Sequence, residues 1–368
     1  MKRRFEIALA EPKDNRELCR LFQIPFDGKI SLSMEREPDY FWGARVQYEE
    51  PETYVCREGP DTAIAACFSV GKRHVFVNGR KTLLRYHSDL RIDPGYQKTS
   101  LLFDICAYFK KRVPLLEGFS QTVVFSDNHI MKGLIDFGEH SRLKSVVPFY
   151  IPHGKYISHM ISVKPGRFRE SGNLVRPACD EDLPAMQKFF DDQAPCKQFY
   201  PCYDFLKMSS EYYRGLTCGN FFLGFEDDQL VAIAGVWDQS YFKQTRVKQY
   251  AGSLKALRPV VNALGALTGG FLLPEEGASL RYLVLHTILV KDNSYERFRQ
   301  IWEAMYQYAW KNNYRYILCG LDENDPLNEV FKGYPGWKTK GTHYLVSYDW
   351  ECCRKLDKRL FYLEAARI

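Results

Sequence analysis

The sequence predicts a mixed α/β protein, with α+β character and mixed sheets, built from two similar units in tandem. Three observations lead to this prediction. A strand, a tight turn and a helix follow one another in the stretch 83–112. The order of strands and helices that begins at Phe5 begins again at Leu174. A chain of 368 residues, 45% of them hydrophobic, is long enough for two domains with separate cores.

The stretch 83–112 reads LLRYHSDLRIDPGYQKTSLLFDICAYFKKR. Its first part alternates as a half-buried strand does, with one set facing one way (Leu84, Tyr86, Ser88, Leu90, Ile92) and one set the other (Arg85, His87, Asp89, Arg91). Asp93-Pro94-Gly95 ends the strand, because proline lacks the amide donor that a sheet needs. A helix follows from about Thr99, and its N-terminus could hold an anion.

The pattern Leu90-x-Ile92-x-Pro94-x-x-Gln97 resembles the core motif of the GNAT superfamily of acyl-CoA N-acyltransferases. In that superfamily, L-x-V-x-P runs into Q/R-x-x-G-x-G/A, and the loop amides bind the CoA pyrophosphate. The resemblance implies two tandem GNAT-like acyl-CoA N-acyltransferase domains and acetyl-CoA as donor. The loop motif is weakened, because Ser100, Leu102 and Lys98 stand where glycines let the backbone approach a phosphate closely.

The resemblance assigns CoA binding to the strand, the loop and the start of the next helix. The residues concerned are Leu90, Arg91, Ile92, Gln97, Lys98, Thr99, Ser100, Leu101, Leu102 and Asn128. The backbone N–H groups of Leu90 and Ile92 are expected to bond the pantetheine or to polarise the thioester carbonyl.

Acyl transfer to an amine needs a base, and the resemblance points to the same strand for it. Asp89 and His87 are the candidates, predicted to face the same way. Asp89 could instead cap a turn or pair with Arg91, and a strand histidine is usually structural or solvated. Many of these enzymes have a tyrosine that acts as the general acid toward the leaving thiolate. In this sequence Leu134 and Ile135 occupy that region.

Glu35 and Arg36 are the candidate substrate residues. The segment that joins the first two helices of GNAT proteins commonly borders the acceptor pocket, and Glu35-Arg36-Glu37-Pro38 is predicted to start the second helix. An equally good interpretation is that Glu35 and Arg36 form an exposed pair on a helix surface.

Turn-rich segments divide the chain. We expect a first GNAT-like domain over 1–163, a linker over 164–173, a more diverged second domain over 174–350 and a C-terminal tail over 351–368. Each domain is expected to close with a hairpin, over 146–163 and 337–349.

The second domain departs from the first in two places. Its counterpart loop, Val290 to Tyr295, has no glycine, and we expect it not to bind CoA. The segment 241–273 is predicted to be a helical insertion with one apolar and one basic face, packed on the neighbouring domain or lying on a membrane.

Composition limits the other possibilities. A net charge of +6 without a basic run argues against nucleic acid as the primary partner. The sequence shows no signal peptide, no membrane-spanning stretch and no His/Cys spacing typical of zinc, and its 11 cysteines indicate reduced thiols. We therefore expect a cytoplasmic protein, monomeric or homodimeric.

The sequence thus predicts transfer of an acetyl or acyl group from acyl-CoA to a small-molecule amine in the first domain. One alternative is a catalytically silent ligand-binding or scaffold protein that kept the fold. Another is a transferase that uses aminoacyl-tRNA as donor, as some tandem GNAT-like proteins do.

Overall fold

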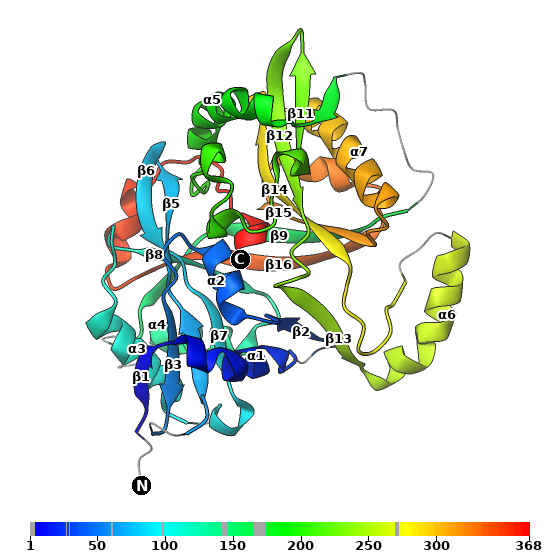
Figure 1. Ribbon diagram of the computed structural model, residues 1–368. Helices are drawn as coiled ribbons and strands as arrows, with labels where there is room; N and C mark the ends of the chain where they lie inside the picture. Colours follow the sequence, from blue (N-terminus) through cyan, green and yellow to red (C-terminus); the bar gives the residue numbers. More distant parts are fainter. Residues whose placement is uncertain are drawn as a thin grey trace.

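The computed structural model describes residues 4–26, 28, 30–59, 62–97, 99–140, 146–164, 174–268 and 272–368. We call 4–164 the first half and 174–368 the second half (Figure 1). The first half contains β1 (Glu6–Leu9), α1 (Asn15–Gln23), β2 (Ile30–Glu35), α2 (Tyr40–Gln47), β3 (Thr53–Arg57), β4 (Ala66–Ser69), β5 (Lys72–Val77), β6 (Arg80–Arg85), β7 (Ser88–Ile92), α3 (Leu101–Arg112), β8 (Ser120–Phe125), α4 (His129–His140) and β9 (Phe149–Ser162).

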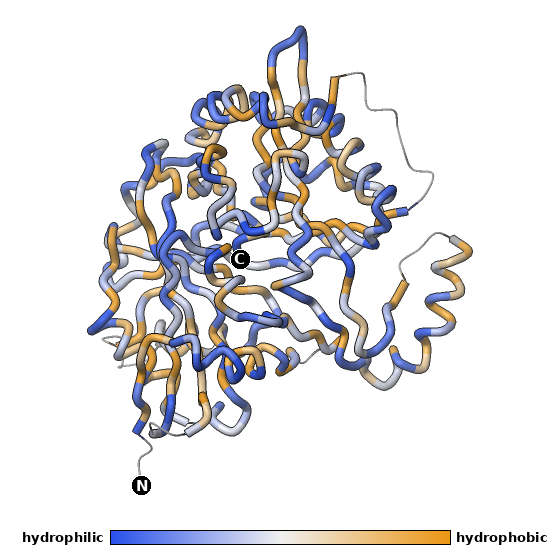
Figure 2. The backbone as a smooth tube through the Cα atoms, viewed as in Figure 1, coloured by the Kyte–Doolittle hydropathy of each residue, from blue (hydrophilic) through white to orange (hydrophobic). Residues whose placement is uncertain are grey.

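The second half shares the opening strand and helix and the strand–helix–strand unit of the first half but differs in its other elements. It contains β10 (Val175–Pro177), α5 (Leu183–Gln193), β11 (Phe221–Glu226), β12 (Gln229–Trp237), β13 (Gln244–Tyr250), α6 (Gly252–Thr268), β14 (Tyr282–Val290), α7 (Tyr295–Lys311), β15 (Tyr316–Asp322) and β16 (Gly336–Ser347). The turn between β11 and β12 is hydrophilic (Figure 2), and its residues Asp227 and Asp228 both have positive φ, as the predicted hairpin requires.

Two sheets carry the fold. The first has the strand order β1-β3-β4-β7, and the second has the order β10-β11-β12-β14-β15-β9-β16-β8. They meet where Tyr86, just before β7, forms a parallel bridge with Gln121 of β8.

The two halves interlock through their last strands. β9 of the first half lies between β15 and β16, and β16 of the second half lies between β9 and β8. Each half therefore contributes a strand to the sheet of the other, and the halves are joined by continuous backbone hydrogen bonding.

Period-two burial in β3 shows how helices cover both faces of the first sheet. Tyr54 packs in a core with Ile105 and Phe109 of α3, whereas the next residue, Val55, packs in a core with α1 and α2. The second half has a larger core, to which α5 and α7 contribute on the upper part of Figure 1.

The strand predicted at the start of the 83–112 stretch is wrong in its extent and in the direction its side chains face. The single strand predicted over 84–92 is two strands, β6 and β7, in different sheets. Asp89 has a φ of 57°, and the pairing of β4 with β7 shifts register between Cys67 and Ser69. This β-bulge ends the simple alternation, so His87 and Asp89 face opposite sides of the sheet.

Other expectations also need correction. The closing hairpins predicted over 146–163 and 337–349 are single long strands, β9 and β16, because each pairs with strands on both sides instead of with itself. Glu35-Arg36-Glu37-Pro38 does not start a helix: Glu35 ends β2, and α2 begins after Asp39, whose side chain accepts from the amide of Phe41.

The helical insertion predicted over 241–273 begins as a strand. β13 has buried Thr245, Val247 and Tyr250 alternating with less buried residues, and it pairs with β2 of the first half. Among the described residues of this segment the α-helix is α6, Gly252–Thr268, which stands to the side of the main body (Figure 1). No helix of the described residues is long and apolar enough to cross a membrane.

Candidate functional site

The β-bulge of β7 is the centre of the candidate site. At Asp89 the backbone leaves the regular ladder, and in the described residues the bonds to β8 come from His87, just before β7 begins. The amide of His87 donates to the Gln121 carbonyl at 2.7 Å, and Thr122 Oγ1 donates to the His87 carbonyl at 3.0 Å. Beyond these bonds the described residues of β7 and β8 are not paired with each other, and we call this unpaired stretch the gap of the first half.

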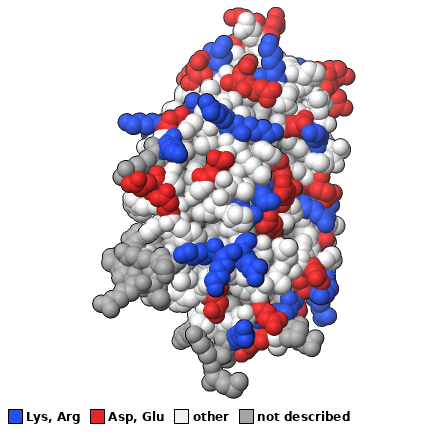
Figure 3. Space-filling view, turned by 90° about the vertical axis from the view of Figure 1, so that its left-hand side faces the viewer, with Lys and Arg blue, Asp and Glu red and all other residues white. Residues whose placement is uncertain are grey.

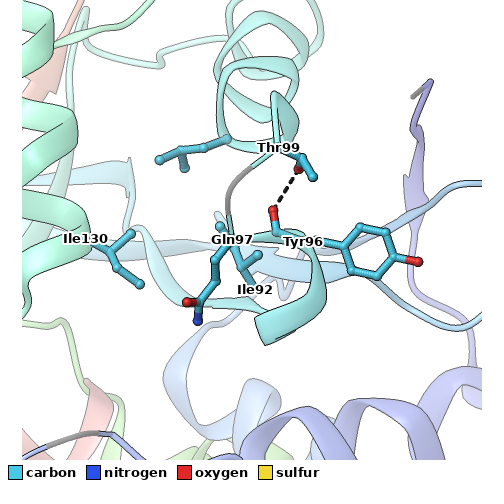
Figure 4. Close-up of a pocket in the computed structure, with 6 residues that line it drawn as sticks. Ile92, Tyr96, Gln97, Thr99 and Ile130 are labelled. Atoms are coloured by element: carbon cyan, nitrogen blue, oxygen red, sulfur yellow. Dashed lines mark hydrogen bonds between the residues drawn. The ribbon is translucent and has the colours of Figure 1, made fainter. Parts of the chain in front are cut away.

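A cavity of about 210 Å³ lies beside Ile92, the last residue of β7. Its lining combines the end of β7, the loop before α3 and the start of α4: Ile92, Tyr96, Gln97, Thr99, Leu102 and Ile130. In Figure 4, Gln97 and Ile130 face the hollow from different sides. Of the loop residues predicted for CoA pyrophosphate binding, Gln97, Thr99 and Leu102 line this cavity, and Lys98 lies outside the described residues.

The loop is shaped by its own hydrogen bonds. Thr99 donates from Oγ1 to the Tyr96 carbonyl at 2.7 Å and accepts from the Leu101 amide at 3.3 Å (Figure 4 shows the first bond). The Thr99 amide also donates to the Tyr96 carbonyl. Besides Thr99 and Leu101, the described residues of this loop and helix start that carry a backbone amide are Gln97, Ser100 and Leu102.

The side chains of the two helix starts also have defined partners. Ser100 Oγ donates to Asp104 in the first turn of α3 at 3.0 Å. Asn128 Oδ1 accepts from the Met131 amide at 3.1 Å and so caps α4. Two helix N-termini with their partial positive charges therefore flank the cavity.

Asp89 is buried and held by two side chains on the α1–α2 side of the sheet. Its Oδ1 lies 3.3 Å from Nη2 of Arg36, and its Oδ2 accepts from the hydroxyl of Tyr40 at 3.2 Å. That hydroxyl also contacts Ser69 Oγ at 2.8 Å. The carboxylate is thus fixed beside the bulge by a charge-assisted contact and a hydroxyl.

His87 lies on the other side. Its ring meets that of Phe109 of α3 edge-on, with centroids 4.7 Å apart. Burial, together with Arg85, lowers the pKa of His87 to about 3, so the imidazole is neutral at ordinary pH. The structure therefore does not bring His87 and Asp89 together.

Glu35 and Arg36 are both buried, so they do not form an exposed surface pair. Glu35 lies between Arg246 (3.0 Å) and Lys248 (2.8 Å) of β13, which lower the pKa of its carboxyl against the effect of burial. The two residues thus connect to different partners, Glu35 to the second half and Arg36 to Asp89.

The second half has an equivalent bulge, but it is occupied. Thr287 of β14 has a φ of 51°, and the pairing of β12 with β14 shifts register between Ile233 and Gly235. β14 and β15 pair from Tyr282–Tyr316 to Val284–Leu318 and diverge beyond that point. The C-terminal segment enters this gap.

Glu364 provides the key contact of that segment. Its Oε2 accepts from the Thr287 amide at 2.9 Å, while the Tyr362 hydroxyl accepts from the Ile288 amide at 3.3 Å. Glu364 is fully buried, and this burial raises its pKa. The backbone amides of the second bulge are therefore saturated by the chain itself.

The loop after β14 is also closed on itself. Asp292 pairs with Arg297 at 2.9 Å, and Asn293 Nδ2 donates to Asp325 at 2.9 Å. Asp325 is in turn bonded to Lys197 at 2.9 Å. In this loop the charged groups satisfy one another.

Sequence reasoning missed several members of these sites. Tyr40, Lys243, Thr287 and Glu364 gave no motif, because each acts through a contact with a residue 45 or more positions away. The one available signal was Tyr362-Leu363-Glu364, a carboxylate in an apolar tail, which indicates a buried and bonded acid.

Charge and metal ligands give little further guidance. On the face seen in Figure 3, basic and acidic side chains of the described residues are interspersed. Within the described ranges, no group of three or more His, Cys, Asp or Glu side chains could hold a metal ion.

Comparison with known proteins identifies the fold. No protein-family model matches the sequence, and no curated protein matches it. A GCN5-related N-acetyltransferase from Sphaerobacter thermophilus superimposes with a TM-score of 0.56 at 11% identity, covering 93% of this chain and 95% of the other. Saccharomyces cerevisiae N-myristoyltransferase with bound myristoyl-CoA gives 0.60 at 9% identity, covering 93% and 79%.

A probable N-acyltransferase from Enterococcus faecalis gives a TM-score of 0.51 at 6% identity and covers 95% of this chain and 74% of its own. At such identities the likeness concerns the fold alone, but it extends over nearly the whole length of the chain. The protein therefore has a mixed α/β GNAT fold.

Proposed function

We propose that the protein is an N-acyltransferase with a single donor site, in the gap between β7 and β8 of the first half, with acetyl-CoA as donor and a small amine as acceptor. One observation carries the proposal. The two halves have the same bulge followed by unpaired strands, but the gap of the second half is filled by Glu364 and Tyr362, whereas in the first half a cavity lies beside the last residue of β7.

The filled gap indicates what the open one could bind. In the second half, amides at the bulge bond a carboxylate oxygen and a hydroxyl oxygen. The equivalent amides of the first half, at Asp89 and Leu90, would meet a thioester carbonyl oxygen in the same way and stabilise its developing negative charge.

The remaining chemistry follows from the neighbouring residues. A bound acyl-CoA supplies a thioester whose carbonyl carbon an amine can attack. The amine nitrogen bonds to that carbon and the carbon–sulfur bond breaks, so one proton must pass from the nitrogen to the thiolate. Asp89, fixed by Arg36 and Tyr40 beside the bulge, is the proposed acceptor of that proton. His87 takes no part in this scheme.

Calorimetric titration of the full chain with acetyl-CoA tests the proposal. We expect one CoA per chain, a rise in melting temperature and release of CoA thiol when a panel of small amines is added. A stoichiometry of two would contradict the assignment to the first half. Binding without thiol release would favour a silent ligand-binding protein, and the absence of binding would contradict the proposed donor.

A further inference from the structure

The face of β7 that contacts α1 and α2 carries more positive than negative charge. Arg36 and Arg91 lie there with Asp89, and both guanidinium groups stack on the ring of Phe22, at 5.1 and 4.9 Å from its centroid. Arg91 also lies 4.1 Å from the ring centroid of Phe26. Arg36 pairs with Asp89 at 3.3 Å, whereas Arg91 has no carboxylate within ion-pair distance among the described residues.

Neighbouring groups do not remove this imbalance. Glu35 is already bonded to Arg246 and Lys248, which approach it from β13. Lys243, buried close to Arg36 and Asp89, adds a further cation and donates to the Ile368 oxygen. Even when Lys243 is set aside, the two arginines outnumber the acid.

Both arginines also have an unused donor. The Nε atoms of Arg36 and Arg91 are shielded from solvent and have no hydrogen-bond partner in the described part of the chain. A sheltered N–H group without a partner is unfavourable, and more so on a charged group, so an anionic ligand would relieve this cost.

Burial lowers the pKa of Arg91 to about 10 and that of Lys243 to about 7, and repulsion from Arg36 contributes to both shifts. This is the expected behaviour of a cationic cluster that lacks a counter-ion. These pKa shifts agree with the positions of the charged side chains, and those positions do not depend on the shifts.

The cluster is placed where an acceptor would arrive. Ile92 lines the donor cavity, and strand alternation turns its neighbour Arg91 to the opposite face of β7. An amine that attacks at the bulge from that face would reach Asp89 beside Arg36 and Arg91.

We infer that the acceptor amine carries an anionic group, a carboxylate or a phosphate, which Arg36 and Arg91 bind. Guanidinium groups recognise both anions through paired N–H donors. The inference rests on the proposed function, because it names the chemical class of the substrate at that site.

A matched series of short amines tests the inference in the full chain with acetyl-CoA. Ethanolamine carries an uncharged hydroxyl group, whereas β-alanine and phosphoethanolamine put a carboxylate or a phosphate at the same end of a two-carbon spacer. We expect kcat/KM for one of the two anionic amines to exceed that for ethanolamine by about tenfold or more. Arg91→Gln should reduce that preference at least several-fold. Arg20→Gln, which removes a more exposed arginine of α1, should leave it unchanged.

A second measurement does not depend on catalysis. The melting temperature is measured with N-acetyl-β-alanine, with the N-acetyl derivative of phosphoethanolamine and with N-acetylethanolamine. We expect only the anionic compounds to raise the melting temperature of the wild-type protein. The rise should be smaller for Arg91→Gln. If that variant does not fold, Arg91→Lys serves instead, since it keeps the charge and loses the paired donors.

The outcomes separate the two hypotheses. Anion-specific stabilisation without any acetyl transfer would contradict the proposed function and leave the anion site standing. Transfer to ethanolamine as fast as to both anionic amines would overturn the anion site alone, as would a preference that survives in Arg91→Gln. No stabilisation by either anionic compound would also overturn it.

Discussion

Asp89 and Thr287 occupy equivalent positions in the two halves, each with positive φ at a register shift in β7 and β14, which both lie fourth in the strand order of their sheets. Their surroundings differ. The amide of Thr287 donates to Glu364, whereas Asp89 lies beside an unfilled gap and is held by Arg36. The same β-bulge therefore occurs in both halves. In the second half it binds the C-terminal segment, and in the first half it forms the candidate site.

The first prediction concerns the loop before α3. Changing Ser100 to Asp places a second carboxylate close to Asp104 at the helix start, where it would oppose a pyrophosphate. We expect CoA affinity to fall at least tenfold, on the order of 1.4 kcal/mol. Titration calorimetry measures the change, and Ser100→Ala is the matched control. Unchanged affinity in a folded Ser100→Asp protein would reject this loop as the pyrophosphate site.

The second prediction separates a catalytic from a structural role of Asp89. Asp89→Asn leaves Arg36 buried without its carboxylate, so we expect it to lower the free energy of unfolding by about 3 kcal/mol. The double variant Arg36→Met/Asp89→Asn should regain most of that stability, as urea titration can show.

Activity gives the decisive comparison. If Asp89 accepts the proton, the double variant should be about 100-fold or more slower than Arg36→Met alone. Equal rates for these two variants would mean that Asp89 only holds Arg36 in place.

The sequence predicted the elements around the site better than the site itself. Local signals such as Asn78-Gly79, Asp93-Pro94-Gly95 and Asp227-Asp228 placed turns correctly, because turn chemistry depends on adjacent residues. The motif around Leu90 and Gln97 led to the correct fold for the same reason. These are short-range patterns.

The failures concern long-range pairing. Nothing local in β9 or β16 shows that each will lie between strands of the other half, so each was interpreted as a hairpin. β13 alternates as a strand because β2, about 210 positions earlier in the chain, provides its partner. The positive φ of Asp89 is imposed by the bulge against β4, and it reversed the predicted facing of His87.

The third prediction concerns pH and Lys243. Burial and Arg36 lower the pKa of this lysine to about 7 in the folded protein, against an ordinary value of 10.5. Between these values the unfolded chain binds one proton more than the folded chain, so stability should rise with pH and level off below pH 7. The extra slope reaches about 1.4 kcal/mol per pH unit. Lys243→Met should lose that slope, and a slope equal to that of the wild type would contradict the assignment.

The last prediction concerns the interlocking of the halves. Gly320 of β15 pairs with Ser158 of β9, and the ring of Tyr156 from the same strand lies across it. A Cβ atom at Gly320 would come within 1.6 Å of the Tyr156 hydroxyl and 2.3 Å of its ring carbon, and Tyr156 is almost fully buried and has no room to move. We therefore expect Gly320→Ala to destabilise the protein by about 1–3 kcal/mol or more.

Gly133 in α4 provides the matched control, because a Cβ atom there meets nothing within 4 Å. Gly133→Ala should be neutral or stabilising by up to about 1 kcal/mol, since alanine favours helix. Thermal unfolding of the two variants compares one exchange of glycine for alanine at two sites. If Gly320→Ala had the same melting temperature as Gly133→Ala, β9 of the first half would not pack against β15 of the second half as described. The interlocked arrangement would then lose its support, because that contact joins the gap of the second half to the last strand of the first.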